Sequence, residues 1–234
     1  MKVKGNFWVG NAGFATFFNE VIHPTNPALF PAKINVSGYE HFANNISLWS
    51  PRSLSLAEFI AVFCAVYQET GGRFESISEY GTAEYFAQKP YGYRYRGRGY
   101  LQITWESNYR IVFDSLGLAL DAFSDAELDA LFKQDKVAFG AIRVLFSDER
   151  LLKKPFDDLA LGKYKEFGTR LNGSPYYGQT LENRVMYILR KLEGQKVKNS
   201  AFLRNKPKIL TTIAIVAIIS VTSYIIYKYK KVSN

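Results

Sequence analysis

Residues 53–72 read SLSLAEFIAVFCAVYQETGG, and they form the most clearly patterned stretch of the chain. Ser55 followed by Glu58 has the spacing of a capping box, in which the two side chains bond backbone N–H groups at the start of a helix. Apolar residues then recur at the spacing of a buried helix face, and two glycines end the pattern. The stretch therefore predicts a buried helix over 53–70 that carries a carboxylate, Glu69, at its end.

The composition is that of a folded domain followed by a basic tail. Of the 234 residues, 47% are hydrophobic and 16% aromatic, which is enough for a substantial core. Eight of the 30 basic residues lie in 196–234, where there is no acidic residue, so the first 195 residues carry a net charge of only +1. No nucleic-acid partner is expected, because the basic charge belongs to the tail. The single cysteine, Cys64, excludes an intramolecular disulfide.

The tail contains a long apolar run, ILTTIAIVAIISVTSYIIY at 209–227, with no charged residue. As a helix it would be about 28 Å long at about 1.5 Å per residue, close to the roughly 30 Å hydrocarbon core of a bilayer. Tyrosines near one end and lysines beyond both ends are typical of interfacial flanks. We therefore expect a globular domain over 1–195, a basic linker over 196–208, a transmembrane helix over 209–227 and a short basic tail over 228–234.

Helix-period patterns continue through the first 195 residues, whereas strand patterns are scarce. We expect further helices over 105–116, 124–133, 135–146, 157–169 and 180–192, while 35–49 fits either a helix or a loop. The fold class predicted is mainly α. No group of cysteine, histidine and acidic residues has the spacing of metal ligands, so we expect no metal and no other cofactor.

Four glutamates lie on the predicted helix end and in the loop after it: Glu69, Glu75, Glu79 and Glu84. Glycoside hydrolysis uses two carboxyl groups, one protonated to supply the leaving oxygen and one ionised to activate water. In inverting enzymes the two lie roughly 6.5–9.5 Å apart, a separation that a helix end and a returning loop can provide. A solvated acidic loop explains the same residues without any chemistry.

Three motifs follow one another along the chain. They are ETGG at 69–72 after the apolar helix, YRGRGYLQIT at 95–104 followed by Asn108-Tyr109, and Asn172-Gly173 followed by Arg184. Arg96 and Arg98 are expected either to pair with the loop glutamates or to lie at the surface. Over about residues 50–195 the chain resembles the family 19 glycoside hydrolases, chitinase-like enzymes that include many bacteriophage endolysins. It departs from them at Gln68, where histidine is frequent, and at Ser107, where an aromatic residue often stands.

The resemblance implies a lysozyme-like helical fold with a cleft for a β-1,4-linked N-acetyl-hexosamine polymer. It places the general acid at Glu69 and the second carboxylate at Glu79, with Glu75 and then Glu84 as the next choices. The other implied positions are Gln102, Thr104 and Asn108, which bind sugar or orient water, and Asn172 and Arg184, which line the cleft or steady the second carboxylate.

With the apolar tail, the resemblance leads us to expect a membrane-anchored glycosidase that hydrolyses the glycan strands of peptidoglycan with inversion, as an endolysin or muramidase. Chitin is less expected, because a short, disulfide-free, membrane-anchored domain suits a bacterial or phage setting. The membrane would be the bacterial inner membrane or the internal membrane of a lipid-containing phage virion. Two alternatives stay open: a lytic transglycosylase that needs only Glu69, and a non-catalytic glycan-binding or structural membrane protein.

Overall fold

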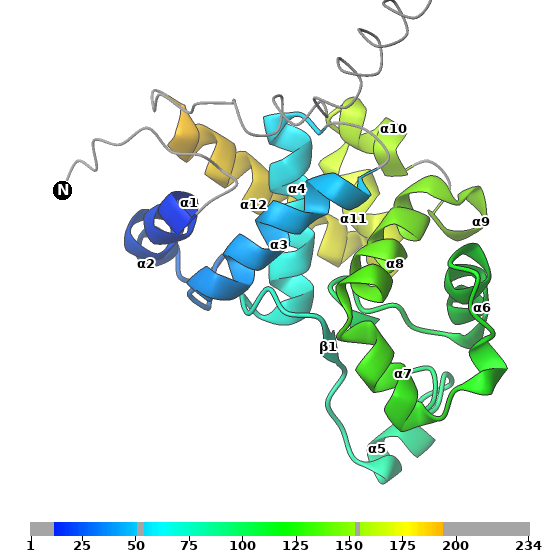
Figure 1. Cartoon of the computed structure of the whole chain (residues 1–234). Helices are drawn as coiled ribbons and strands as arrows, with labels where there is room; N and C mark the ends of the chain where they lie inside the picture. The colour runs from blue at the N-terminus through cyan, green and yellow to red at the C-terminus, as the bar shows by residue number, and fades with distance from the viewer. Residues whose placement is uncertain (1–11, 51–53, 153–154, 194–234) are drawn as a thin grey trace, which may run out of the picture.

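The computed structural model of the chain describes residues 12–50, 54–152 and 155–193. Its helices are α1 (Ala12–Phe17), the π-helical turn η1 (Phe18–Ile22), α2 (His23–Thr25), α3 (Val36–Trp49), α4 (Leu56–Thr70), α5 (Ala83–Ala87), α6 (Glu106–Ser115), the 3-10 turn η2 (Leu120–Ala122), α7 (Asp125–Phe132), α8 (Asp135–Ser147), α9 (Glu149–Leu152), α10 (Pro155–Ala160), α11 (Tyr164–Asn172) and α12 (Pro175–Leu192). The described part of the chain is mainly helical, as its sequence predicts (Figure 1).

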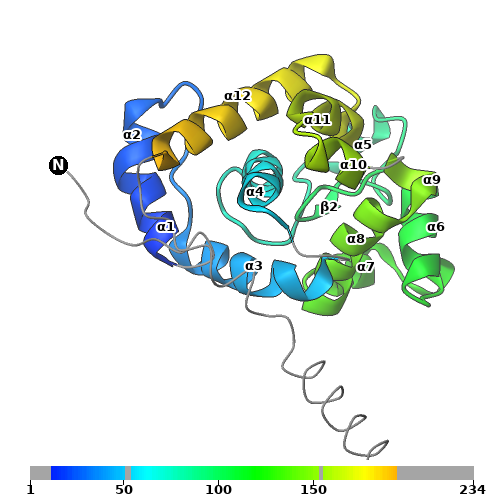
Figure 2. The same ribbon diagram turned by 90° about the horizontal axis from the view of Figure 1, so that it is seen from above.

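Helix α4 occupies the centre of the molecule. Seen from above it stands end-on, with α1 and α3 on one side and α11 and α12 on the other (Figure 2). All residues from Phe59 to Tyr67 are buried, which removes the apolar face and most of the opposite face from water. The capping box of Ser55 and Glu58 forms at its start, and Gly71 ends it with a φ of 59°. The helix predicted from the opening stretch is therefore confirmed.

An aromatic cluster packs α1, α3 and the segment after α4 against α4 itself. The Phe63 ring lies 5.3 Å from the ring centroid of Phe14, 5.7 Å from that of Tyr39 and 5.0 Å from that of Phe74. Each such pair contributes about 0.5–1.5 kcal/mol beyond the burial of its surface. Because Phe74 follows the two glycines, this cluster also fixes the path of the chain just after Glu69.

A small hairpin connects this helical layer to a second group of helices. Strand β1 (Ile77–Ser78) pairs antiparallel with β2 (Arg98–Gly99), so that Ile77 lies opposite Gly99. Helices α5, α6 and α7 lie beyond the hairpin, at the lower right of Figure 1. The chain segment between the two strands thereby returns toward the end of α4.

Two predicted helices differ from those observed. The single helix expected over 157–169 is two helices, α10 and α11, separated by a turn in which Gly162 has a φ of 70°. The last helix starts at Pro175 instead of Thr180, because the Ser174 side chain caps it and proline is favoured in a first turn. The segment 35–49, left open between helix and loop, forms α3 with Asn35 as its cap.

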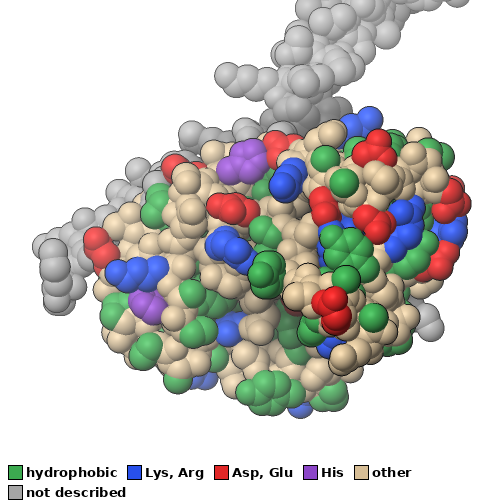
Figure 3. All heavy atoms as spheres, turned by 90° about the horizontal axis from the view of Figure 1, so that it is seen from below, with side chains coloured by type: hydrophobic (Ala, Val, Ile, Leu, Met, Phe, Trp, Pro, Cys, Tyr) green, Lys and Arg blue, Asp and Glu red, His purple; other side chains and the backbone are tan. Residues whose placement is uncertain are grey.

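Charged and apolar side chains are interspersed over the face of the molecule shown in Figure 3. No helix within 12–50, 54–152 and 155–193 has the length and apolarity needed to cross a bilayer. The predicted span 209–227, its linker and its basic tail lie outside the described residues.

Candidate active site

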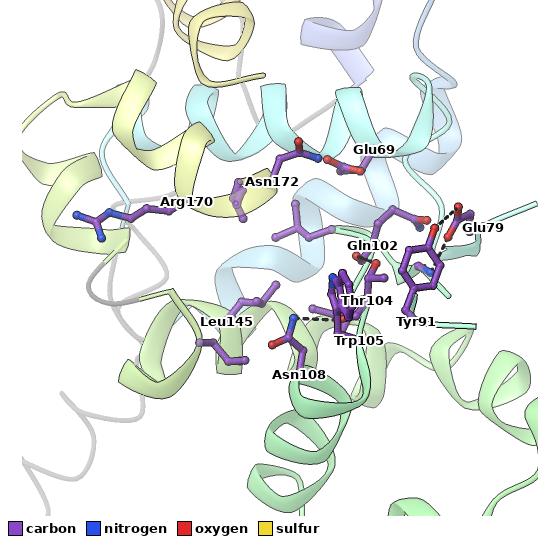
Figure 4. A pocket seen from close by; sticks show the side chains of 15 residues that line it. Glu69, Glu79, Tyr91, Gln102, Thr104, Trp105, Asn108, Leu145, Arg170 and Asn172 are labelled. Carbon is purple, nitrogen blue, oxygen red and sulfur yellow. Dashed lines mark hydrogen bonds between the residues drawn. The ribbon is translucent and has the colours of Figure 1, made fainter. Parts of the chain in front are cut away.

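A cavity of about 600 Å³ opens between the end of α4 and the loop that leads into α6. Its polar lining includes six predicted site residues: Glu69, Glu79, Gln102, Thr104, Asn108 and Asn172. Tyr91 and Trp105 complete the wall near Glu79, and Leu145 and Arg170 lie toward the far end (Figure 4). Leu151 also lines the cavity. The fold thus brings together residues from four separate parts of the sequence.

Glu69 lies in the last turn of α4, where its side chain is largely withdrawn from water. Burial raises the pKa of its carboxyl group, and a weaker interaction with the Tyr177 hydroxyl lowers it. That hydroxyl is itself buried and has no hydrogen-bond partner of normal geometry among the described residues, Glu69 included, so its effect on Glu69 is a weak one. The net effect favours the protonated form of Glu69, which is the form a proton donor needs.

Glu79 follows β1 and is held by three hydrogen bonds. The Tyr91 hydroxyl donates to its Oε1 at 3.0 Å, the Tyr85 hydroxyl to the same oxygen at 3.3 Å, and the Gly97 backbone N–H to its Oε2 at 3.0 Å. The Glu79 backbone N–H donates in turn to the Gly97 carbonyl oxygen at 2.7 Å. Burial and the nearby carboxylate raise the pKa of Tyr91 to about 12, so the phenol stays a donor. The sequence motifs identify neither tyrosine. Tyr91 belongs to the tyrosine-rich run before Gly97, which is a signal in the sequence, whereas Tyr85 lies outside that run.

The other two candidate carboxylates are placed differently. Glu84 lies in the exposed first turn of α5 and lines neither this cavity nor the neighbouring one. A hydrogen bond from its own backbone N–H and one from Thr82 lower its pKa, as at an ordinary helix start. Glu75 is exposed and lines the neighbouring cavity, together with Glu69 and Glu79. Of the three, Glu79 alone shares both cavities with Glu69.

Gln102, Thr104 and Asn108 use their hydrogen-bond donors to shape the cavity wall. Gln102 Nε2 donates to the backbone oxygens of Ile77 at 3.1 Å and Gly99 at 2.9 Å. Thr104 Oγ1 donates to the Gln102 carbonyl at 2.9 Å, and Asn108 Nδ2 donates to the Thr104 carbonyl at 2.8 Å. These bonds tie the start of α6 to the hairpin, and they leave the Asn108 Oδ1 atom without a partner among the described residues.

Arg184 does not line the cavity, contrary to the expectation. Its side chain is buried between α4 and α12, where Nε donates to the Leu29 carbonyl at 2.8 Å and Nη1 donates to Gln68 Oε1. The guanidinium also lies over the Tyr67 ring, 5.2 Å from its centroid. Arg184 is therefore linked to the site through its hydrogen bond to Gln68, the residue before Glu69, and it does not contact Glu79.

Arg96 and Arg98 are buried, and both pair with Asp129 instead of a loop glutamate. Arg98 Nε lies 2.6 Å from Asp129 Oδ1, and its Nη1 donates to the Tyr109 hydroxyl at 2.8 Å. Burial disfavours ionisation of Asp129, but the hydrogen bond from Ser78 and the two guanidinium groups outweigh it and lower the pKa. The arginines hold the loop to α7, so neither expected alternative, pairing with a loop glutamate or exposure at the surface, is observed.

A second cavity, of about 940 Å³, continues from the first on the other side of Glu69, Glu79 and Gln102. Its lining carries charges of both signs, from Arg73, Lys133, Glu75 and Asp135, and it also includes His41. His41 Nε2 lies 2.8 Å from Asp135 Oδ1. A groove therefore extends on both sides of the two glutamates, as an extended substrate requires.

Three non-glycine residues of the described chain have a positive φ, and all three line these cavities. They are Phe74 at 55°, Gln102 at 49° and Trp105 at 77°. Such conformations cost of order 1–3 kcal/mol each and gather at functional sites. Among the described residues, no group of three histidine, cysteine or acidic side chains could hold a metal ion.

No family model and no curated protein matches this sequence. The structure is similar to that of chitinase C from Streptomyces griseus HUT6037, with a TM-score of 0.51 and 21% identity over 76% of this chain and 78% of that chain. It is also similar to a mutant form of chitinase C, with a TM-score of 0.53 and 20% identity over 83% of this chain and 98% of that chain. The chain therefore has the chitinase-like fold that its sequence motifs imply.

Proposed function

We propose that this protein is a glycosidase that hydrolyses a β-1,4-linked N-acetyl-hexosamine polymer with inversion. One observation carries the proposal: Glu69 and Glu79 line the same cavity in contrasting surroundings. Burial favours the neutral form of Glu69, whereas three hydrogen-bond donors point at the Glu79 carboxylate. A neutral carboxyl group as proton donor and a carboxylate held in place by hydrogen-bond donors are what the reaction needs.

In the proposed reaction Glu69 gives its proton to the glycosidic oxygen as the bond from that oxygen to the anomeric carbon breaks. Glu79 takes a proton from a water molecule whose oxygen attacks the anomeric carbon from the opposite face. Each product then carries a hydroxyl group, and proton exchange with solvent restores the two carboxyl groups. The hydrogen bonds from Tyr91 and Gly97 keep Glu79 in one orientation during this step.

We propose peptidoglycan as the substrate in preference to chitin. Chitin is a neutral polymer, whereas peptidoglycan carries peptides with carboxylate and ammonium groups. Charges of both signs line the second cavity, including Arg73, Lys133 and Glu75, none of which forms an ion pair within the described residues. These side chains offer complementary partners to the charged substituents of a peptidoglycan strand.

Analysis of the products tests the reaction. The full chain, kept in a mild detergent, is incubated with purified peptidoglycan and with oligomers of N-acetylglucosamine. The fragments are identified by mass spectrometry, and the anomers released from the oligomers are identified by proton NMR. The proposal expects reducing ends, with the anomer of opposite configuration formed first from the oligomers. Anhydro-muramyl ends would instead identify a lytic transglycosylase, which needs only Glu69. Binding without any cleavage would favour the non-catalytic alternative.

We further propose that 209–227 anchors the protein in the bacterial inner membrane or in the internal membrane of a lipid-containing phage virion. The support is the uncharged length of this segment and its basic flanks. Flotation with lipid vesicles tests the anchor. A variant with Ala217→Asp and Ile218→Lys should stay in solution, because each charge at the span centre costs about 2.5–3.5 kcal/mol on insertion scales. The matched variant with Ala217→Leu and Ile218→Val should float like the parent.

A further inference from the structure

Trp105 occupies an unusual place in the first cavity. It is the residue before α6, with φ 77° and ψ 138°, a combination that glycine adopts readily and bulky residues rarely do. Nevertheless the residue remains 47% exposed, and it lines the cavity. A strained backbone and an exposed indole are both unfavourable, so the folded state alone gives no reason for tryptophan at this position.

The strain is maintained by hydrogen bonds on both sides of the residue. The Trp105 backbone N–H donates to the Tyr95 carbonyl at 3.1 Å, and its carbonyl accepts from the backbone N–H groups of Asn108 and Tyr109, each at 3.1 Å. Tyr109 is fully buried, with its hydroxyl donating to the Arg96 carbonyl. The surrounding structure therefore fixes this backbone conformation whichever side chain is present.

The indole is directed to the cavity instead of the core. Its aromatic neighbour is Tyr91, which it meets in an edge-to-face arrangement with ring centroids 5.6 Å apart. Tyr91 in turn donates to Glu79, so the indole lies next to the residue that orients the second carboxylate (Figure 4). Asn108 and Asn172 lie on the same cavity, and the Asn172 side chain makes no hydrogen bond to another described residue.

From this arrangement we propose that Trp105 is a stacking platform for one hexosamine ring of the substrate, bound beside Glu79. The inference rests on the proposed function, since it takes the ligand to be a glycan. One face of a pyranose ring presents C–H groups, which pack on an indole face and remove apolar surface from water. The free Oδ1 of Asn108, on the same wall as Trp105, can accept a hydrogen bond from the acetamido N–H of that sugar, whereas the Asn172 amide lies across the cavity beside Glu69 (Figure 4).

The test measures binding separately from cleavage. Trp105→Ala, Trp105→Tyr and Trp105→Gly are each made in the full chain, in the parent and in a Glu69→Gln background in which the sugar is not consumed. Calorimetry gives the Kd for N-acetylglucosamine oligomers, tryptophan fluorescence reports on the indole, and thermal unfolding reports on stability. Trp105→Ala should weaken binding at least about 10-fold, as expected when a stacked tryptophan is removed. Trp105→Tyr should retain binding to within a few-fold but lose the fluorescence response.

Trp105→Gly separates a binding role from a structural one. It should bind sugar as poorly as Trp105→Ala, yet unfold at a higher temperature than that variant, because glycine relieves the positive φ. Oligomer binding unchanged in Trp105→Ala would overturn the platform, as would a parent chain that binds no oligomer. If the parent binds oligomers through Trp105 but cleaves no glycan, the proposed reaction fails while the platform stands.

Discussion

The Tyr91 hydroxyl donates a 3.0 Å hydrogen bond to Oε1 of Glu79. Together with the Gly97 N–H on the other carboxylate oxygen, this bond ties a loop residue to the segment that returns as β2. A carboxylate in a loop would otherwise sample many orientations. Glu79 can thus hold the fixed position that a base requires, even though no helix or strand carries it.

Tyr91→Phe should lower kcat about 10-fold or more while KM changes little, because hydrogen bonds to charged groups are worth about 1.5–3 kcal/mol. The ring is retained, so the contact with Trp105 stays. Tyr85→Phe is the matched control: its hydroxyl is 3.3 Å from the same oxygen and its side chain is exposed, so the loss should be smaller. Steady-state kinetics on a soluble oligomer measures kcat and KM for both variants. Equal losses of kcat in the two variants would contradict the role given to Tyr91.

The pH profile should report the environment of Glu69. A general acid acts while protonated, so activity is lost as the pH rises through its pKa, and burial places that loss at higher pH than for an ordinary glutamic acid. In Tyr177→Phe the interaction that lowers the pKa of Glu69 is gone, so the basic limb of kcat/KM should move to still higher pH. Movement of that limb toward lower pH would contradict this account of Glu69.

Asp129→Asn should destabilise the fold strongly. The variant leaves the fully buried Arg98 without its counter-charge, and breaking such a pair typically costs about 3–5 kcal/mol. Asp125→Asn is the matched control, since Asp125 pairs with the part-exposed Arg94 and should cost less than about 1 kcal/mol. Urea unfolding at neutral pH measures both, and similar small losses would show that the Asp129 pairing is dispensable.

The Asp129 effect should also depend on pH. Its pKa is lowered in the folded state, so its contribution to stability is present at neutral pH and is lost as the pH falls through the folded pKa. The difference in unfolding free energy between the parent and Asp129→Asn should therefore shrink below about pH 4, where an unfolded aspartate begins to take up protons. A difference that is constant between neutral and strongly acid pH would contradict the ion pair.

Local features of the fold could be predicted from the sequence, because their causes lie within a few residues. The capping box of α4 and its glycine end are examples. The hydrogen bonds to Glu79 could not, because they join residues 6, 12 and 18 positions away whose meeting depends on the tertiary fold. For the same reason the partner of Arg98 was missed, since Asp129 lies on a helix far along the chain.

The burial of Arg184 could be predicted from the helical periodicity of α12. Arg184 lies three residues after Leu181 and four before Ile188, both of which face the core, so it shares their side of α12. The motif order placed it in the cleft, but the helical phase places it in the core. For Arg184, the buried side of α12 on which it lies determines where its side chain points, and its position in the motif does not.

The rate of reducing-end release from peptidoglycan by Glu69→Gln and Glu79→Gln, beside Glu75→Gln and Glu84→Gln, tests the central claim most directly. The account predicts that the first two variants lose about 10²–10⁴-fold in kcat, the usual contribution of acid–base groups, while the other two stay within a few-fold of the parent. Activity retained in Glu69→Gln, or lost equally in Glu84→Gln, would contradict it.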